Sequence, residues 1–396
     1  VIVPRFEPFQ ALRYGSNTAL GDVCSPPYDV LSDADRLALA NKHERNIVHV
    51  DMPLAPSGNA YEHAASILSE WIRNGVLVRD DVPSFTLYRM KFTDSTGKAR
   101  NVVGVIGALE VVDEGAGGVL PHERTTPKAK TDRLELTRAT DANLSPVWGL
   151  SLAADLSTLL TESAEILGEL TDDLGVIHSV ERVSDAKRIS QISAAISAHP
   201  VVIADGHHRY AISRTYRDEV RKRRHSTSTG AELTMTYINE LIDEQLSVAA
   251  IHRLYTDVSA ETLLKTLEAS FTVTDAPPIN PKTLATMEQD GCLCFIDRDL
   301  QTKWLTPRTD AFDGIRSLDS ARLEHALRDL AHTVSFQHGV TEVVDVLSQQ
   351  QANAAILIRP VSVAEIKRTA TEGILMPPKS TFFTPKLRTG FVIREL

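Results

Sequence analysis

One short segment constrains the fold of this chain more than any other. Residues 201–204 are apolar and mostly β-branched, Val-Val-Ile-Ala, and Asp205-Gly206 follows as a turn signal. Two histidines, Arg209 and a helical pattern come next. A buried strand that turns at glycine into a helix brings free backbone N–H groups and the positive end of the helix dipole together. The segment therefore predicts an anion site, to which Arg209 adds a planar guanidinium suited to phosphate.

This segment and several others also carry a family resemblance. Asp205-Gly-His-His-Arg-Tyr-Ala211 resembles the phosphate-binding box of the ParB/sulfiredoxin-like superfamily, and within it the box of the free-serine kinases. The segment from Leu120 to Arg133, Leu-Pro-His-Glu-Arg-Thr-Thr-Pro-Lys-Ala-Lys-Thr-Asp-Arg, resembles the His-Glu segment that precedes the box in those kinases. Over nearly its full length the chain is similar to a bacterial family catalogued as domain of unknown function one-zero-one-five. Three further segments support that similarity: Ser25-Pro-Pro-Tyr-Asp-Val30, Asn143-Leu-Ser-Pro146 and Met376-Pro-Pro-Lys-Ser-Thr-Phe-Phe-Thr-Pro-Lys386.

The kinase resemblance implies a reaction. In the free-serine kinases the box grips the phosphates of the nucleotide and a glutamate is the catalytic base. The chain is therefore expected to transfer a phosphoryl group from ATP or ADP to the hydroxyl of a small metabolite, with free L-serine as the first candidate, and with Mg²⁺ as cofactor. The residues expected to bind the phosphates are Asp205, Gly206, His207, His208 and Arg209.

The remaining site residues follow from the same resemblance. Glu123 is the expected base, and His122 beside it the expected proton shuttle or phosphate donor. Asp205 is also expected to hold Mg²⁺ or to orient a histidine. Lys379 is expected to contact the phosphates or the product. Asp29, Thr125 and Lys128 are expected to line the substrate pocket, Asp29 for example by holding an amino group.

Each of these residues also has a purely structural interpretation. Adjacent histidines often cap or pack a helix. Glu123 near a helix start is also explained by an ion pair with Arg124, Lys128 or Arg133. Asp29 fits a rigid turn equally well, and Lys379 fits a surface loop. The chain also departs from the kinases, because Glu123 and Arg209 lie 86 positions apart, which predicts extra elements between about residues 151 and 199.

The composition of the chain indicates which kinds of partner and which compartment to expect. The 396 residues carry a net charge of −10, which argues against nonspecific binding of nucleic acid. The three cysteines form no disulfide framework, which favours a reducing compartment. No apolar run reaches the roughly 18 residues of a membrane span, and the first residues show no signal-peptide pattern. A cytoplasmic protein without nucleic-acid or membrane partners is expected.

The alternation of helical and strand patterns predicts an α+β fold with mixed sheets, a ParB/sulfiredoxin-like nucleotide-binding core and additional α/β elements. We expect an N-terminal α+β region over 1–112, the core with both motifs over 113–256, and a C-terminal α+β region over 257–396. Within the core, residues 157–174 and 184–199 are predicted as helices. Residues 233–238 and 246–255 are predicted as further strands of the same sheet.

Two rival functions use the same site. A phosphatase or nucleotidase would deliver the phosphoryl group to water instead of a metabolite. A nucleotide-binding regulatory module would bind without turnover, because members of the resembled superfamily use the box as a ligand-gated switch.

Overall fold

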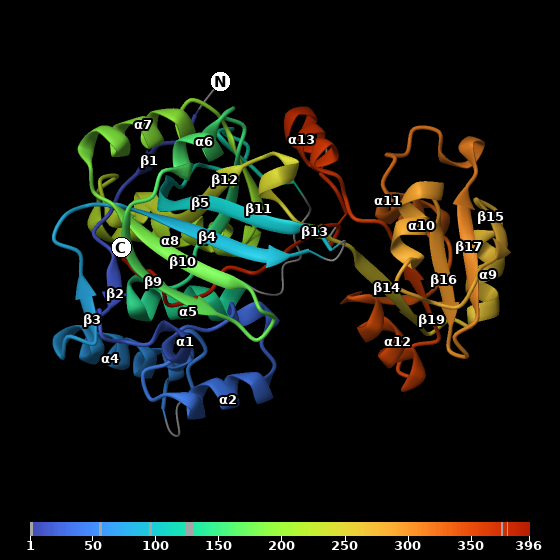
Figure 1. Cartoon of the computed structure of the whole chain (residues 1–396), viewed down its shortest axis with the longest axis horizontal. Helices are drawn as coiled ribbons and strands as arrows, with labels where there is room; N and C mark the ends of the chain where they lie inside the picture. Colours follow the sequence, from blue (N-terminus) through green and yellow to red (C-terminus); the bar gives the residue numbers. More distant parts are fainter. Residues whose placement is uncertain (1–2, 55–57, 95–96, 123–129, 374, 378) are drawn as a thin grey trace. The chain divides into compact units, whose positions relative to one another are not determined.

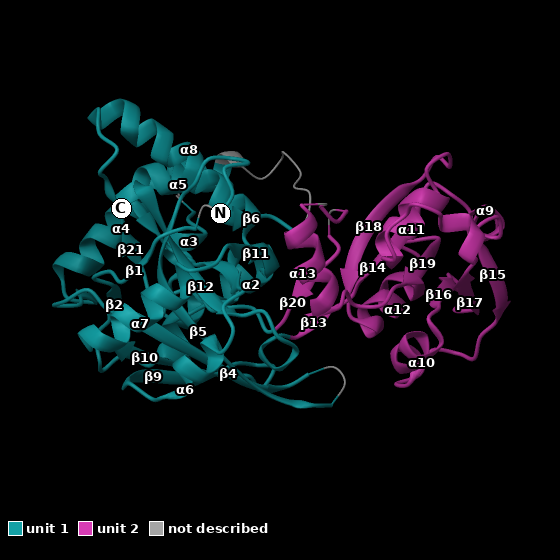
Figure 2. Ribbon diagram, turned by 90° about the horizontal axis from the view of Figure 1, so that it is seen from above, with its two compact units in different colours: residues 1–246, 385–396 teal, residues 247–384 magenta. Residues whose placement is uncertain are grey.

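The computed structural model covers the whole chain and describes residues 3–54, 58–94, 97–122, 130–373, 375–377 and 379–396, with the backbone alone described at 130 and 131 (Figure 1). The chain forms two compact units. Unit 1 comprises residues 1–246 and 385–396, and unit 2 comprises residues 247–384 (Figure 2). Both units combine helices with sheets, which confirms the predicted mixed α+β class. The three-part division at residues 112 and 256 stays a prediction.

A mixed sheet forms the centre of unit 1. Its strands run in the order β6-β11-β8-β12-β5-β4-β10-β9, and β1 pairs with β5. The pairs β11–β6 and β12–β8 are parallel, and the others are antiparallel. The bounds are β1 (Phe6–Glu7), β4 (Phe85–Thr93), β5 (Ala99–Glu110), β6 (Val119–Leu120), β8 (Val147–Ser151), β9 (Glu165–Thr171), β10 (Ile177–Val183), β11 (Val201–Asp205) and β12 (Leu233–Glu240).

Alternating side chains bury both faces of this sheet. On one face, Phe85 and Leu87 of β4 pack with helices α6 and α7. On the opposite face, Tyr88 of β4 meets Tyr237 of β12 edge to face at 5.7 Å, and Trp148 of β8 meets Tyr237 at 5.5 Å. The sheet is therefore packed on both faces, and β11, the strand that leads into the predicted site, pairs with β8 within it.

The helices and short strands of unit 1 surround this sheet. The helices are α1 (Leu20–Val23), α2 (Asp33–Lys42), α3 (Val48–Asp51), α4 (Ala60–Arg73), α5 (Lys130–Thr140), α6 (Leu156–Thr161), α7 (Ala186–Ile196) and α8 (His207–Arg224). The short strand pairs are β2 (Leu12–Tyr14) with β3 (Leu77–Arg79), and β7 (Ala142–Asn143) with β21 (Arg394–Glu395). Helix α5 contacts both α4 and α8.

Two predicted elements are wrong. Residues 157–174 are not one helix, because the chain forms α6 and then strand β9, which pairs with β10 at the edge of the sheet. Residues 246–255 do not continue the sheet of β12. They form β13 (Val248–Ala249) and most of β14 (Ile251–Thr256), both in unit 2. Apolar periodicity reports that a strand is buried, but it does not report which sheet buries it.

Unit 2 has its own antiparallel sheet and its own core. The strand order is β15-β17-β16-β19-β14-β18, and apolar clusters cover both faces. The strands are β15 (Phe271–Asp275), β16 (Leu293–Asp297), β17 (Thr302–Pro307), β18 (Thr333–His338) and β19 (Ala354–Leu357), and β13 pairs with β20 (Phe382–Phe383). The helices are α9 (Ala260–Leu267), α10 (Thr283–Asp290), α11 (Asp319–Ala326), α12 (Val340–Ser348) and α13 (Val363–Glu372).

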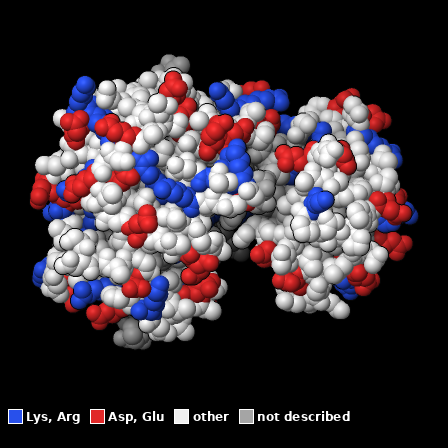
Figure 3. All heavy atoms as spheres, in the orientation of Figure 1, with Lys and Arg blue, Asp and Glu red and all other residues white. Residues whose placement is uncertain are grey.

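Two surface properties bear on partners. Acidic and basic side chains are interspersed on the face shown in Figure 3. Among the described helices, none has both the length and the apolar character that a bilayer crossing requires.

Candidate functional site

The predicted strand, turn and helix are present in unit 1. Strand β11 ends at Asp205, Gly206 adopts a left-handed φ of 84°, and helix α8 begins at His207. Only glycine suits this position, because a Cβ on Gly206 would lie 2.9 Å from Nε of Arg209. The Arg209 guanidinium therefore lies against the turn, beside the positive end of an 18-residue helix.

Asp205 joins the turn to two cations. Its Oδ1 accepts a hydrogen bond from the Gly206 N–H at 2.9 Å. Its Oδ2 accepts from Nζ of Lys386 at 3.0 Å and lies 3.5 Å from Nη2 of Arg209. Burial alone would raise the pKa of Asp205, but the two cations outweigh it and hold this pKa well below its usual range. The carboxylate is ionised at neutral pH and holds both cations beside the turn.

Arg209 is fixed from two sides. Its Nη1 donates to the backbone carbonyl of Pro146, in the predicted Asn-Leu-Ser-Pro segment before β8, and its Nη2 faces Asp205. Its side chain is 12 % exposed. A guanidinium has five N–H donors, so these two contacts leave donors for a phosphate.

Two of the predicted histidines, the buried His122 and the half-buried His207, are neutral at pH 7. The His122 Nδ1–H donates to the carbonyl of Ile203 in β11, and the imidazole ring lies 4.9 Å from the ring of His207. Burial lowers the pKa of His122 to about 4. Burial, together with His122, lowers the pKa of His207 well below its usual value. Nε2 of His207 is buried and has no hydrogen-bond partner among the described residues. His208 is half-buried beside them.

Sequence reasoning missed Lys386. The prediction chose Lys379 from the Pro-rich segment at residues 376–386, but the lysine that pairs with Asp205 closes that segment. Lys386 belongs to unit 1, because the chain returns there at Pro385. Lys379 is an exposed residue of unit 2 with a φ of 57°. The segment at residues 376–386 contains two lysines, and the second, Lys386, is the one that would have predicted this contact.

Asp51 was also missed. It is the last residue of α3, its side chain is buried, and it pairs with Arg133 of α5. The Arg133 guanidinium lies 4.1 Å from the centre of the Tyr28 ring. The neighbouring Asp29, predicted to hold an amino group, is exposed. No pattern around Asp51 distinguishes it from a structural acid.

A small pocket of about 50 Å³ in unit 1 has Asp51, Arg133 and Arg209 in its lining. It is lined by Asp51, Arg133, Leu136, Thr137, Ala142, Asn143, Leu144, Ser145, Val147, Arg209, Ile212, Ser213 and Thr234. Its charged lining comes from one acid and two arginines, and its other walls are apolar or neutral polar. The pocket is therefore continuous with the arginine of the predicted phosphate box.

The remaining predictions concern the catalytic base, two substrate-pocket residues and the Mg²⁺ ligand. Glu123, Thr125 and Lys128 lie outside the described residues. Within the described parts of the chain, no three His, Cys, Asp or Glu side chains are grouped to hold a metal ion. Asp205, predicted to bind Mg²⁺, is engaged with Lys386 and Arg209.

Comparisons with solved structures give remote likenesses. A conserved hypothetical protein from Pyrococcus furiosus is 11 % identical, with a TM-score of 0.39 over 70 % of this chain and 91 % of that chain. A free serine kinase variant in complex with ADP is 10 % identical, with a TM-score of 0.37 over 69 % and 89 %. SbnI with a C-terminal truncation, from Staphylococcus aureus, is 14 % identical, with a TM-score of 0.40 over 73 % and 87 %.

The family comparison is more specific. No curated protein matches the chain. The model of one family matches residues 6–321, most of the chain, and this is the family predicted from the motifs. The chain therefore belongs to the family described as "Protein of unknown function (DUF1015)".

Proposed function

We propose that this protein is a nucleotide-dependent phosphotransferase that moves a phosphoryl group from ATP or ADP to the hydroxyl of a small metabolite, with free L-serine as the first acceptor to test. One observation carries the proposal. The start of helix α8, the Arg209 guanidinium and the Lys386 ammonium converge on the turn at Gly206. Helix dipole, backbone N–H groups and two cations at one point favour a polyanion such as a nucleotide phosphate chain.

Asp205 organises the two cations for that role. Without a ligand its carboxylate neutralises part of their charge, at 3.0 Å from Lys386 and 3.5 Å from Arg209. A phosphate that binds here would accept hydrogen bonds from the remaining N–H groups of Arg209 and Lys386. Asp205 would keep both side chains in position. Nε2 of His207, which has no hydrogen-bond partner within the described parts of the chain, adds a further polar atom near the turn.

The transfer itself follows from positioning and charge neutralisation. Glu123, assigned by the kinase resemblance, would take the proton of the acceptor hydroxyl. The hydroxyl oxygen then forms a bond to the terminal phosphorus, and the bond from that phosphorus to the bridging oxygen breaks, so the electron pair leaves with the shortened nucleotide. Arg209 and Lys386 would stabilise the charge on the transferred group and on the leaving oxygen.

Mg²⁺ fits this site only in part. Asp205 is the one carboxylate of the box, and it faces two cations. Mg²⁺ is commonly held by one or two carboxylates, the substrate phosphates and water. Bound in that way, it would supply further neutralisation of phosphate charge.

His122 fits a positioning role. Its Nδ1–H is committed to the Ile203 carbonyl and its pKa lies near 4, so it is neutral at pH 7. It would hold the end of β11 and the His207 ring in place. His122 directly precedes Glu123 in the sequence.

Phosphorus NMR tests the proposal. Protein and Mg²⁺ are incubated with ATP or ADP, with and without L-serine, and Glu123→Gln is compared with the wild type. Phosphoserine that forms in the wild type and not in Glu123→Gln supports the kinase. Phosphate release without serine supports the hydrolase. Bound but unchanged nucleotide, after a screen of other hydroxyl acceptors, supports the regulatory module and contradicts the kinase.

A further inference from the structure

The pocket beside Arg209 has the construction of a subsite for a second small molecule. Leu136 of α5, Leu144 of the loop before β8 and Ile212 of α8 supply apolar walls, and Asp51 and Arg133 supply charge. At about 50 Å³ it has room for a small polar group and not for a nucleobase or a ribose. It shares Arg209 with the proposed phosphate site.

Asp51 lines this pocket, and one of its carboxylate oxygens accepts no hydrogen bond from the described residues. Its side chain is buried, with 3 % exposure, and Oδ1 accepts from Nη1 of Arg133 at 3.2 Å. The same Nη1 donates to the backbone carbonyl of Asp51 at 2.6 Å. Oδ2 is buried and has no hydrogen-bond partner among the described residues. A buried carboxylate oxygen without a donor is costly, so this atom requires a partner that the described chain does not provide.

Arg133 does not turn toward that second oxygen. Its Nε donates to Oδ2 of Asp132 at 2.9 Å, and its guanidinium lies against the ring of Tyr28. These contacts fix Arg133 where it can donate to Oδ1 of Asp51. An ion pair with Arg133 alone does not account for the burial of Oδ2 without a hydrogen-bond donor among the described residues. A residue that lines the pocket thus has a buried acceptor with no donor among the described residues.

We propose that Oδ2 of Asp51 binds the ammonium group of the acceptor, so that the substrate class is a small compound with both an amino and a hydroxyl group. This inference rests on the proposed function of the neighbouring phosphate site. An ammonium group offers three donors and a full positive charge, which compensates a buried carboxylate better than a hydroxyl does.

The position of Asp51 also suits this role better than that of Asp29. Asp29 was expected to hold an amino group, but it is exposed. Of these two acids, only Asp51 lines the pocket to which Arg209 also belongs. Because Arg209 lines the pocket as well, an acceptor held there by its amino group would have its hydroxyl close to the phosphates.

Binding of matched ligand pairs tests the inference. The pairs are ethanolamine against ethylene glycol and L-serine against glycerate, in which an ammonium group is replaced by a hydroxyl. Affinities are measured by NMR titration with and without ADP for the wild type, Asp51→Asn and Asp81→Asn. Asn at position 51 keeps an acceptor for Arg133, and Asp81 is an exposed control.

We expect the wild type and Asp81→Asn to bind each amine at least tenfold more tightly than its hydroxyl counterpart. Asp51→Asn loses this preference, with its affinity for ADP and its melting temperature close to those of the wild type. A wild type without amine preference, or an Asp51→Asn variant that keeps it, overturns the inference. If ADP itself does not bind, the phosphate-site proposal fails, and the titrations without ADP still decide the role of Asp51.

Discussion

A single carboxylate, Asp205, pairs with one cation that is local in the sequence and with one that is distant. Lys386 follows it by 181 positions, and Arg209 lies one helical turn beyond it. The sequence pattern around Asp205 predicted the turn and the arginine correctly, because both are local. It could not indicate Lys386, since no local periodicity records a contact across 181 positions. For the same reason Asp51 resembled any other acid at a helix end.

Replacement of Lys386 tests the second cation. We expect Lys386→Ala to weaken ADP binding about tenfold or more, because a charge-assisted hydrogen bond contributes about 1.5–3 kcal/mol. Lys187→Ala, an exposed lysine of α7, is the matched control and should bind ADP as the wild type does. Lys379→Ala, measured alongside, decides whether the lysine indicated by the resemblance contributes as well. Equal affinities for Lys386→Ala and Lys187→Ala would exclude Lys386 from the site.

The buried His122 predicts a dependence of stability on pH. The pKa of His122 is near 4 in the folded protein and about 6.5 in an unfolded chain, so the unfolded state binds more protons between these values. The stabilisation is therefore complete above about pH 6.5 and is lost as the pH falls toward 4. We expect the melting temperature to fall less between pH 7 and 5 in His122→Asn than in the wild type. His63→Asn, at an exposed position of α4, should follow the wild type. Parallel curves for all three proteins would contradict the assignment.

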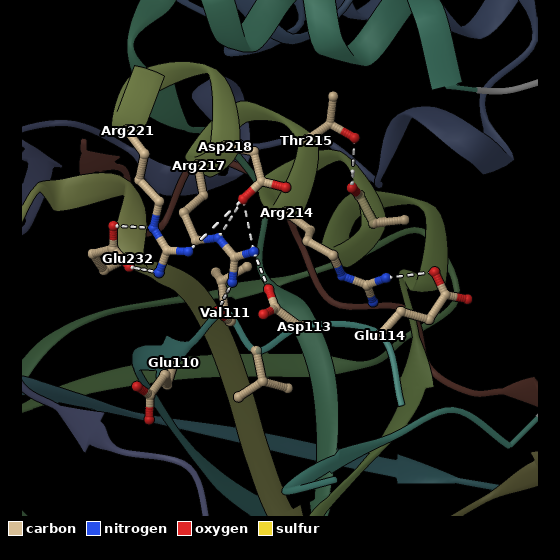
Figure 4. A network of polar contacts seen from close by, with 12 residues as sticks. Glu110, Val111, Asp113, Glu114, Arg214, Thr215, Arg217, Asp218, Arg221 and Glu232 are labelled. Carbon is tan, nitrogen blue, oxygen red and sulfur yellow. Dashed lines mark hydrogen bonds and ion pairs between the residues drawn. The ribbon is translucent and has the colours of Figure 1, made fainter. Parts of the chain in front are cut away.

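At the scale of elements, helix α8 is joined to the rest of unit 1 by polar contacts beyond its first turn. The side of the helix bearing Arg214, Arg217 and Arg221 forms a polar network with the segment from Glu110 to Glu114 and with Glu232 (Figure 4). The four basic residues at its end, Arg221-Lys-Arg-Arg, also complement the negative end of the helix dipole. The helix is thus fixed along its length by charges that do not belong to the site.

Arg217 is the most buried member of this network and is expected to matter most for stability. It is 2 % exposed and donates to the Val111 carbonyl and to Asp113. We expect Arg217→Met to lower the free energy of unfolding by about 1–3 kcal/mol, because a buried carbonyl loses its donor. Arg214→Met removes an ion pair with the exposed Glu114 and should cost less than about 1 kcal/mol. Urea unfolding followed by fluorescence measures both, and equal losses would contradict the role of Arg217.

Some elements were predictable and others were not. The strand, turn and helix of residues 201–224 were found because a β-branched apolar run, a glycine turn and helix periodicity follow one another there. The segment at 157–174 was assigned to one helix, but its second half forms β9, a strand at the sheet edge with several exposed positions, including Ile166. Such an edge strand lacks the regular alternation that marks a half-buried strand.

At the scale of the whole molecule, unit 2 is inserted between Leu246 and Pro385 of unit 1 (Figure 2). The short segment after the insertion carries Lys386 back to the sheet of unit 1 and ends in β21, which pairs with β7. The sequence predicted a separate C-terminal region but not this return. Composition and periodicity describe segments one at a time, and they contain no record of which unit a segment rejoins.

Equilibrium binding of ADP to the wild type, Arg209→Ala and Arg214→Ala tests the central claim most directly. Each variant removes one positive charge from helix α8, Arg209→Ala at the turn and Arg214→Ala further along the helix. All three proteins are first shown to melt cooperatively. We expect Arg214→Ala to bind ADP as the wild type does and Arg209→Ala to bind at least tenfold more weakly. Wild-type protein that does not bind ADP, or an Arg209→Ala variant that binds it unchanged, would show that the turn at Gly206 is not a nucleotide phosphate site.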